Sequence, residues 1–285
     1  MVDAYRPDRL LEALKIRNEQ SVELLAGGTD LMVHYKNWSG LNPKFSKPVL
    51  FLDNMAELKA VDLVGSEIRI GASCTLTQIL AERCIPEILK EAVDAIAAPA
   101  LKNRATLMGN VCNASPAGDS IPPLIVLNAR ICLSSAKGER ELSIAEFITG
   151  PGQTVLQENE IATAILIPES DWHISYFRKV GTRKANALTK LSLTGLANVA
   201  GDMVDDIRIA FGAVGPTIVR SVELEDTMKG LPLAQLNVKK IVGQYAPLLR
   251  PIDDQSSTAQ YRKTVSLNLL RYFLHHVAHV SHRSA

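Results

Sequence analysis

The chain has 285 residues, a length typical of about two domains, and 47% of them are hydrophobic. Its 31 Lys and Arg residues against 30 Asp and Glu leave a net charge of +1, which argues against binding to nucleic acid or to an anionic membrane surface. No segment approaches the roughly 18 apolar residues of a membrane span, and the N-terminus has no apolar run of signal-peptide length. We therefore expect a cytoplasmic protein with no membrane insertion.

The cysteines and histidines predict no metal site. The four cysteines form no CxxC pair and are expected to be reduced, buried thiols, at Cys74, Cys84, Cys112 and Cys132. Three histidines fall within residues 275–279, where a solvated helix end that complements the helix dipole is favoured over a metal ligand set. If the protein moves electrons, a cofactor other than its own cysteine-bound cluster has to carry them.

The N-terminal segments predict a small α/β domain at residues 1–58. Apolar spacing indicates, in chain order, a helix from Leu10 toward Asn18, a strand over Ser21–Leu25, a short helix from Leu31, a strand over Val49–Leu52 and a helical turn over Met55–Leu58.

The next segments predict a second α/β domain at residues 59–173. They are a strand at Ile68–Ile70, a helix through Glu82 with a Thr75–Gln78 capping box, an amphipathic helix over Pro86–Ile96, an apolar run at Leu124–Leu127, a hairpin of Ala129–Ser134 with Arg140–Leu142, a Ser143–Glu146 capping box and a strand over Glu160–Ile167.

The C-terminal residues 174–285 predict a separate α+β domain, because strands are followed by helices. We expect a three-stranded antiparallel sheet from Ile174–Val180, Leu188–Val199 and Ile207–Val214, then helices over Val222–Met228, Leu233–Leu248 and Gln260–Val280. Ser257 and Gln260 have the spacing of a capping box for the last helix.

A glycine-bearing loop at Leu24–Leu31 lies between the first predicted strand and a helix. Its paired Gly27 and Gly28 let a backbone approach a phosphate closely, and the helix start that follows favours an anion. A tight structural turn explains this loop equally well.

A second loop, at residues 105–119, carries many hydrogen-bonding groups and no basic side chain. Its composition favours turns whose backbone N–H groups remain free, which suits a pyrophosphate. We hypothesise that both loops close on one dinucleotide. The Asp119 carboxylate could serve either of two roles: it accepts hydrogen bonds from a ribose, or it caps a turn or a helix.

The usual nucleotide and hydrolase motifs are absent. There is no G-x-G-x-x-G, no GxxxxGK[ST], no GxSxG and no HExxH, so a Rossmann domain is not supported. Lys190, among leucines of a predicted strand, either extends its amine to solvent from the strand face or directs it to a cofactor, and the residues alone favour the former.

The chain resembles the FAD-binding medium subunit of the xanthine dehydrogenase and carbon monoxide dehydrogenase family of molybdenum hydroxylases. The resemblance spans nearly the whole length and rests on ordered motifs: Ala26–Leu31, Arg104–Thr106 with Gly109–Asn110, Ala114–Pro116 with Asp119, Arg178–Arg183, Arg208–Val214 with Pro216 and Arg220, and Tyr261–Lys263. It implies an α+β protein with a vanillyl-alcohol-oxidase-type (PCMH-like) FAD-binding fold of two α/β subdomains and a C-terminal α+β domain like that of CO dehydrogenase flavoproteins.

The resemblance also implies the cofactor contacts. Carried over by position, FAD contacts fall at Leu24, Leu25, Ala26, Gly27, Gly28, Thr29, Asp30, Leu31, Ala97, Thr106, Met108, Gly109, Asn110, Asn113, Asp119, Ile161, Ala162 and Lys190. Met108 departs from the family pattern, which has the first Gly of a Gly-Gly pair there, so its side chain has to fit beside the cofactor or point away. No side chain is expected to act as a nucleophile or general base.

The implied function is electron transfer within a heterotrimer. A small subunit with two iron–sulfur clusters and a large molybdopterin subunit are the expected partners, and FAD on this chain would pass electrons to an acceptor such as NAD. The residues leave two alternatives open: a stand-alone FAD-dependent reductase on a related fold, and a nucleotide-binding or assembly module that has lost redox function.

Overall fold

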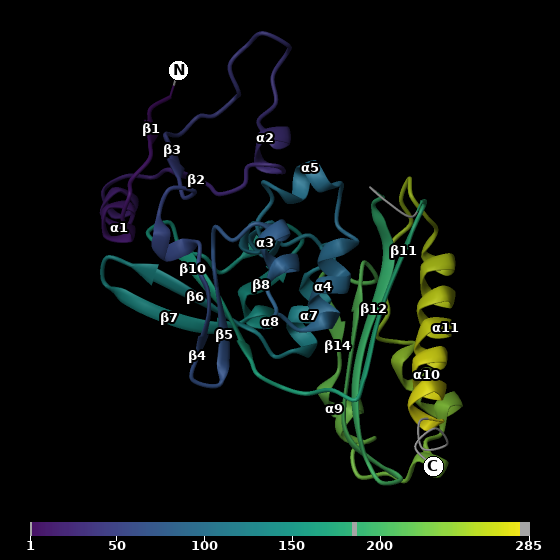
Figure 1. Cartoon of the computed structure of the whole chain (residues 1–285). Helices are drawn as coiled ribbons and strands as arrows, with labels where there is room; N and C mark the ends of the chain where they lie inside the picture. Colours follow the sequence, from purple (N-terminus) through teal and green to yellow (C-terminus); the bar gives the residue numbers. More distant parts are fainter. Residues whose placement is uncertain (1, 184–186, 280–285) are drawn as a thin grey trace. The chain divides into compact units, whose positions relative to one another are not determined.

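The computed structural model describes residues 2–183 and 187–279, which form two compact units (Figure 1). The first unit comprises residues 1–85, 97–114 and 128–169, and the second comprises residues 86–96, 115–127 and 170–285. Both units are therefore built from segments that are distant in sequence. The predicted domain boundaries at residues 58 and 173 stay predictions.

The first unit holds two main sheets and short helices. Its elements are β1 (Ala4–Tyr5), α1 (Leu10–Glu19), β2 (Glu23–Leu25), α2 (Leu31–His34), β3 (Val49–Phe51), η1 (Ala56–Leu58), β4 (Val61–Val64), β5 (Glu67–Gly71), α3 (Leu76–Ala81), α5 (Pro99–Lys102), α6 (Leu107–Cys112), β6 (Arg130–Ser135), β7 (Gly138–Ser143), α8 (Ile144–Phe147), β8 (Ile148–Gly150), β9 (Gln153–Thr154) and β10 (Ile161–Pro168).

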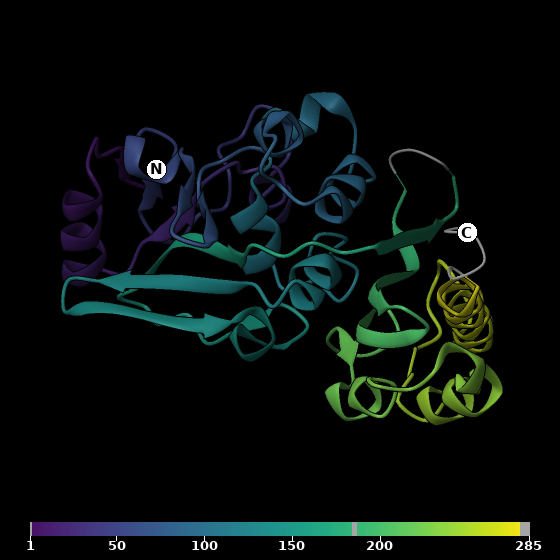
Figure 2. The same ribbon diagram turned by 60° about the horizontal axis from the view of Figure 1, so that its bottom comes forward.

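The two sheets of this unit differ in strand direction. The small sheet is parallel with the order β1-β3-β2, and the larger antiparallel sheet has the order β4-β5-β10-β6-β7. The teal hairpin in Figure 2 is β6 with β7. Strand β10 is central and buried on both faces from Ile161 to Ile167, which explains why its sequence is a continuous apolar run. The predicted strand at residues 160–167 is confirmed.

Two predicted capping boxes are present in the first unit. Thr75 caps α3 by accepting a hydrogen bond from the Gln78 amide, and the Gln78 side chain returns to the Thr75 amide. Ser143 and Glu146 make the same reciprocal pair at the start of α8. Each pair satisfies two helix-terminal amides, which fixes where these short helices begin.

The second unit packs helices on both faces of an antiparallel sheet. Its elements are α4 (Glu87–Asp94), α7 (Ile121–Val126), β11 (Ile174–Gly181), β12 (Thr189–Ala200), β13 (Met203–Gly212), β14 (Val219–Arg220), α9 (Val222–Asp226), η2 (Leu233–Gln235), α10 (Val238–Tyr245) and α11 (Ala259–Ala278).

The predicted three-stranded sheet of this unit has a fourth strand. Its order is β11-β12-β13-β14, and β14 pairs Val219 with Phe211 and Arg220 with Ala210. Two residues are too few to show a period of two in sequence, so the prediction of three strands was wrong at this edge. In Figure 1, α10 and α11 lie along one face of the sheet and α4 and α7 along the other.

Two predicted helix boundaries in this unit are wrong. The single helix expected over residues 233–248 is divided into η2 and α10, because Asn237 leaves the helical conformation and caps α10 by accepting from the Lys240 amide. Helix α11 is capped by Thr258, since Ser257 is held one residue earlier in a turn with Asp254. The predicted end of this helix at Val280 lies outside the described residues.

Within residues 2–183 and 187–279, no helix is long and apolar enough to cross a membrane. The four cysteines are free thiols, as predicted, but only Cys74 is a buried residue; Cys84, Cys112 and Cys132 are half-buried, so the expectation of four buried thiols was wrong. Burial raises the pKa of Cys74 and Cys132 to about 11 and that of Cys112 to about 12, so these three thiols stay protonated at neutral pH.

Candidate cofactor site

Residues 26–31 form a cradle of backbone N–H groups between the end of β2 and the start of α2. Among the described residues, no acceptor is recorded for any of the six amides from Ala26 to Leu31. The residues themselves are half-buried apart from the exposed Asp30. Because unpaired amides at protein surfaces favour anions, this cradle suits a phosphate group.

The glycines of the cradle have distinct structural roles. A Cβ on Gly27 would lie 2.1 Å from the backbone oxygen of Arg104, so the close approach of these two backbones requires glycine. Gly28 has φ of +74°, the left-handed region that favours glycine. The cradle therefore packs directly against Arg104 and Ala105, where the second predicted loop begins. This contact is consistent with the hypothesis that both loops close on one dinucleotide.

The second loop is not a run of turns, as its composition indicated, because residues 107–112 form helix α6. Thr106 caps this helix, accepting from the Gly109 amide at 3.0 Å, and pairs as an isolated bridge with Thr75. Leu107 and Val111 are fully buried, so tertiary packing overrides the weak helix propensity of the Gly and Asn residues between them.

The side chain of Met108, which replaces a glycine of the family pattern, is buried in the core of the unit. Met108 is only 4% exposed. Its backbone N–H, in the first turn of α6, has no acceptor recorded within the described part of the chain. Met108 thus presents an amide where a helix N-terminus favours an anion, while the thioether points away from solvent.

An apolar pocket of about 370 Å³ adjoins the cradle. Leu25, Gly27, Gly28, Phe45, Phe51 and Arg104 are among the residues that line it. The pocket thus combines apolar and aromatic walls with one basic residue, Arg104, one acidic residue, Asp3, and the backbone of the cradle glycines. Such a combination fits one end of a dinucleotide, whose base is apolar and whose phosphates are anionic.

Leu24 lies in β2, and the other remaining predicted contacts of the first unit lie before α5, at α6 and in β10. Ala97 has φ of 50°, an uncommon conformation for a residue with a Cβ. Asn113 is the exposed C-terminal cap of α6, and Asn110 is half-buried within it. Ile161 and Ala162 are buried in β10, where they pair with Ser134 and Leu133 of β6.

Asp119 and Lys190 belong to the second unit, where both have partners of their own. The Asp119 carboxylate accepts from Lys179 Nζ at 2.7 Å and from Thr189 Oγ1 at 2.6 Å. Burial raises the pKa of Asp119, and the Lys179 charge and both hydrogen bonds offset part of that rise. Lys190 Nζ lies 5.5 Å from the centre of the Tyr261 ring, within cation–π range.

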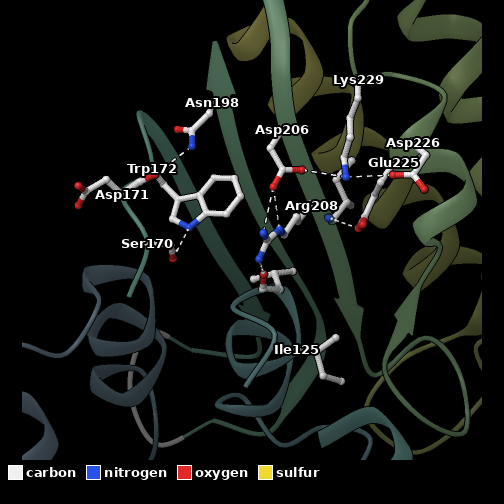
Figure 3. Close-up of polar contacts among 12 residues, drawn as sticks. Ile125, Ser170, Asp171, Trp172, Asn198, Asp206, Arg208, Glu225, Asp226 and Lys229 are labelled. Carbon is white, nitrogen blue, oxygen red and sulfur yellow. Dashed lines mark hydrogen bonds and ion pairs between the residues drawn. The ribbon is translucent and has the colours of Figure 1, made fainter. Parts of the chain in front are cut away.

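The second unit also holds a polar network that sequence reasoning missed. Figure 3 shows the Arg208 guanidinium over the Trp172 indole, 4.6 Å from the ring centre, and hydrogen-bonded to Asp206. Lys229 bridges Asp206 and Asp226. Arg208 belongs to a family motif, but two of its partners, the Trp172 ring and the Val126 carbonyl, are distant in sequence, and an alternating strand pattern alone does not indicate them. The network fastens Trp172, in the segment that precedes β11, to β13.

No group of three or more His, Cys, Asp or Glu side chains within residues 2–183 and 187–279 is arranged to hold a metal ion.

Two protein-family models match most of the chain, including the cradle. Residues 1–170 match the family model described as the FAD binding domain in molybdopterin dehydrogenase, and residues 175–277 match the CO dehydrogenase flavoprotein C-terminal domain. The chain belongs to the FAD-binding subunit family of the molybdopterin dehydrogenases. The family, the fold class and FAD as the cofactor are thereby confirmed.

Curated relatives of this FAD-binding subunit cover most of its length. The caffeine dehydrogenase subunit beta of Pseudomonas sp. strain CBB1 is 30% identical over 268 residues, covering 91% of this chain and 89% of the relative. The glyceraldehyde dehydrogenase medium chain of Sulfolobus acidocaldarius is 29% identical, covering 91% and 92%. The xanthine dehydrogenase FAD-binding subunit of Escherichia coli O157:H7 is 29% identical, covering 80% of each.

Solved structures show the same fold. Carbon monoxide dehydrogenase from Hydrogenophaga pseudoflava has a TM-score of 0.87 at 22% identity, covering 96% of each chain. Quinoline 2-oxidoreductase from Pseudomonas putida 86 has a TM-score of 0.87 at 20% identity, covering 99% of this chain and 98% of that one. The FAD-binding subunit fold therefore extends over both units.

Proposed function

We propose that this chain holds FAD with the cradle at residues 26–31 and the first turn of α6, and relays electrons between a partner subunit and an acceptor. The observation that carries the proposal is the row of six consecutive amides without a recorded protein acceptor, in the part of the chain that matches the FAD-binding family. The protein residues bind and orient the diphosphate without any basic side chain in the cradle itself.

Each predicted contact of the first unit has a part in this proposal. The Ala26–Leu31 amides and the Met108 amide face the diphosphate, with Gly27, Gly28 and Gly109 keeping the backbone close. The Phe45 and Phe51 side chains of the adjoining pocket exclude water from the apolar end of the cofactor. The remaining positions of the predicted set, Leu24, Ala97, Asn110, Asn113, Asp119, Ile161, Ala162 and Lys190, are proposed as further contacts on the strength of the family resemblance.

When bound, FAD supplies the capacity to take up electrons singly and release them as a pair. The chain then needs no nucleophile or general base of its own. Its residues would fix the cofactor, and α6, which carries part of the site, packs against the buried strand β10. We propose that electrons come from the iron–sulfur clusters of a small partner subunit, that a large molybdopterin subunit carries the hydroxylation, and that NAD is one possible class of acceptor.

The subunit names of the relatives support an assembly of several chains rather than a stand-alone reductase. The relatives are named as a medium chain, a subunit beta and an FAD-binding subunit. The reductase alternative predicts turnover by the isolated chain with NADPH, and the assembly-module alternative predicts that FAD does not bind at all.

The proposal is tested on the purified chain and on the complex. We expect a flavin absorbance spectrum in the full chain, either as isolated or after titration with FAD, at one flavin per chain. We expect the complex with both partner subunits to reduce this flavin when the substrate is added, and the chain alone to leave the substrate unchanged. Lack of flavin binding at saturating FAD would contradict the proposal, and turnover by the chain alone would favour the reductase.

A further inference from the structure

Residues 97–114 belong to the first unit, although residues 86–96 and 115–127 on either side of them belong to the second. We name residues 97–114 the α5–α6 segment, after the two helices that it contains. The segment carries the Met108 amide of the proposed FAD site, and its Arg104 carbonyl packs against Gly27 of the cradle. The second unit therefore holds the chain directly before and directly after a segment that carries part of the proposed site.

One lysine of the second unit binds the chain on both sides of this segment. Lys179 Nζ donates to the Ala95 carbonyl at 2.9 Å and to the Asp119 carboxylate at 2.7 Å. We name these two hydrogen bonds the Lys179 link. The Lys179 side chain is 13% exposed and that of Asp119 is 7% exposed, so water competes little for either group. Because a single ammonium group makes both bonds, its two acceptors stay within about two hydrogen-bond lengths of each other.

The backbone is held in an uncommon conformation at both ends of the α5–α6 segment. Its first residue, Ala97, has φ of 50°, and its last residue, Ala114, has φ of 49°. Residues with a Cβ rarely adopt this left-handed region, and they keep it only where the surrounding structure holds them there. Asn128, where the chain next returns to the first unit, has φ of 53°. Three of the four non-glycine residues with positive φ in the described part of the chain thus lie at crossings between the units.

The connections between the Lys179 link and the segment are short. At the first crossing, one residue separates Ala95 from the segment. At the second crossing, the Ala114 carbonyl accepts from the Gly152 amide at 3.0 Å within the first unit, and the Pro116 carbonyl accepts from the Ala213 amide at 2.8 Å within the second. The chain on either side of the segment therefore has little freedom to absorb a shift of Ala95 or Asp119.

We propose that Lys179 is a positioning residue for the FAD site. By holding Ala95 and Asp119 together, the Lys179 link fixes both ends of the α5–α6 segment and keeps the Met108 amide where it meets the diphosphate. This inference rests on the proposed function. Lys179 is not one of the predicted FAD contacts, so it acts through the segment, as the supporting residues of a binding site do.

Two other roles for Lys179 predict different results. If Lys179 only stabilises the second unit, its loss lowers stability and leaves the FAD affinity of the folded protein unchanged. If Lys179 acts only by orienting Asp119, which is itself proposed as a further FAD contact, then removal of another Asp119 partner should weaken FAD binding as well. The variants below separate these roles from the proposed one.

The test uses four variants of the full chain. Lys179→Met removes the Lys179 link. Lys179→Met combined with Asp119→Asn removes it without leaving a buried charge unpaired, so this double variant keeps the test open if the single variant does not fold. Thr189→Val removes the other Asp119 partner, at 2.6 Å, and leaves the link in place. Leu270→Ala, at a fully buried residue of α11, destabilises the second unit through a cavity and also leaves the link in place.

Two properties are measured on protein that circular dichroism shows to be folded. Hydrogen exchange of the chain without FAD, followed by mass spectrometry, reports the protection of the amides at residues 97–114. Flavin fluorescence titration reports the FAD dissociation constant. Without the link, we expect these amides to exchange at least about tenfold faster, in the single and in the double variant. We expect Lys179→Met to bind FAD at least about tenfold more weakly. Thr189→Val and Leu270→Ala should match the wild type in both properties.

The contradicting outcomes are distinct from a failure of the proposed function. Wild-type exchange at residues 97–114 in the variants without the link, or wild-type FAD affinity in Lys179→Met, would overturn the inference and leave the proposed function intact. An equal loss of affinity in Thr189→Val would assign the effect to Asp119, and an equal loss in Leu270→Ala would assign it to the stability of the second unit; either result overturns the inference. A wild-type chain that does not bind FAD would overturn the proposed function.

Discussion

Lys179 Nζ lies 2.7 Å from the Asp119 carboxylate and also donates to the Ala95 carbonyl at 2.9 Å. The Asp119 side chain is buried at 7% exposure, and that of Lys179 is largely covered at 13%. Because Ala95 ends α4 and Asp119 precedes α7, one lysine on β11 fastens two separate segments of the second unit to its sheet. A buried ion pair of this kind is costly to break, since the remaining charge is left without a partner.

The first prediction concerns this pair. Lys179→Met should lower the free energy of unfolding by about 3–5 kcal/mol at pH 7, because Asp119 then stays buried without its cation. Loss of Lys179 removes the charge that lowers the pKa of Asp119, so this pKa rises further. When the pKa of a carboxyl group is higher in the folded than in the unfolded protein, the folded protein loses stability as pH rises from the unfolded pKa to the folded pKa. Urea unfolding at several pH values between 4 and 8 should therefore show the deficit growing with pH.

Arg178→Met is the control for this prediction, because Arg178 is the neighbouring residue on β11 and is exposed. Its effect should be within about 0.5 kcal/mol. A Lys179→Met deficit that is independent of pH would show that lost packing, not an unpaired Asp119, causes the destabilisation.

The second prediction tests the cradle. Gly27→Ala puts a Cβ 2.1 Å from the Arg104 carbonyl oxygen, and since that atom is backbone it cannot rotate away. The cradle has to shift, and we expect FAD affinity to fall at least about tenfold, equivalent to about 1.4 kcal/mol. Flavin fluorescence titration of the apoprotein measures the affinity.

Gly243→Ala is the matched control, because Gly243 lies in α10 with no heavy atom within 4 Å of its added Cβ. Alanine should be tolerated there or should stabilise the helix by up to about 1 kcal/mol. If Gly27→Ala binds FAD as the wild type does, the cradle is not the diphosphate site, provided that circular dichroism shows the variant to be folded.

Much of the local structure was predictable because its cause is local. The Thr75–Gln78 and Ser143–Glu146 capping boxes, the buried strand β10 and the glycine pair of the cradle all follow from residues within a few positions of one another. The family motifs then identified the cofactor.

The contacts that position the site were not predictable, because their partners are far apart in the chain. Gly27 needs to be glycine because of a carbonyl 77 positions later, and Asp119 is paired with a lysine 60 positions later. Helix α6 forms inside a Gly- and Asn-containing loop because Leu107 is buried by the fold. Propensity alone favoured turns there, since it takes no account of tertiary packing.

The third prediction concerns the cap of α6. Thr106→Ala removes the oxygen that accepts from the Gly109 amide and should lower stability by about 0.5–2 kcal/mol. Because the same helix start carries the Met108 amide, FAD binding should weaken as well. Thr106→Ser keeps the hydroxyl and should restore both properties. Thermal unfolding and flavin titration measure them separately; equal loss in the Ser and Ala variants would assign the effect to the methyl group.

The fourth prediction is an acid dependence that comes from Glu160 in the first unit. Arg140 donates to both carboxylate oxygens of Glu160, at 2.6 and 2.9 Å. The hydrogen bonds from Arg140 lower the pKa of Glu160, more than its burial raises it. A carboxylate with a lowered folded pKa contributes stability above its unfolded pKa and loses it as pH falls through the folded value.

Glu160→Gln should therefore lower the free energy of unfolding by about 1–2 kcal/mol at pH 7. This is near the low end of the range for hydrogen bonds to charged groups, because Arg140 is partly exposed to solvent. The difference from wild type should shrink as pH falls below about 4.3, the ordinary pKa of glutamate, because the wild type then loses the contribution of Glu160 as pH falls toward its lowered folded pKa. Glu158→Gln, at an exposed neighbour, is the control and should be nearly neutral. Urea unfolding from pH 7 to pH 3 measures the trend, and a constant difference over that range would exclude Glu160 ionisation as its origin.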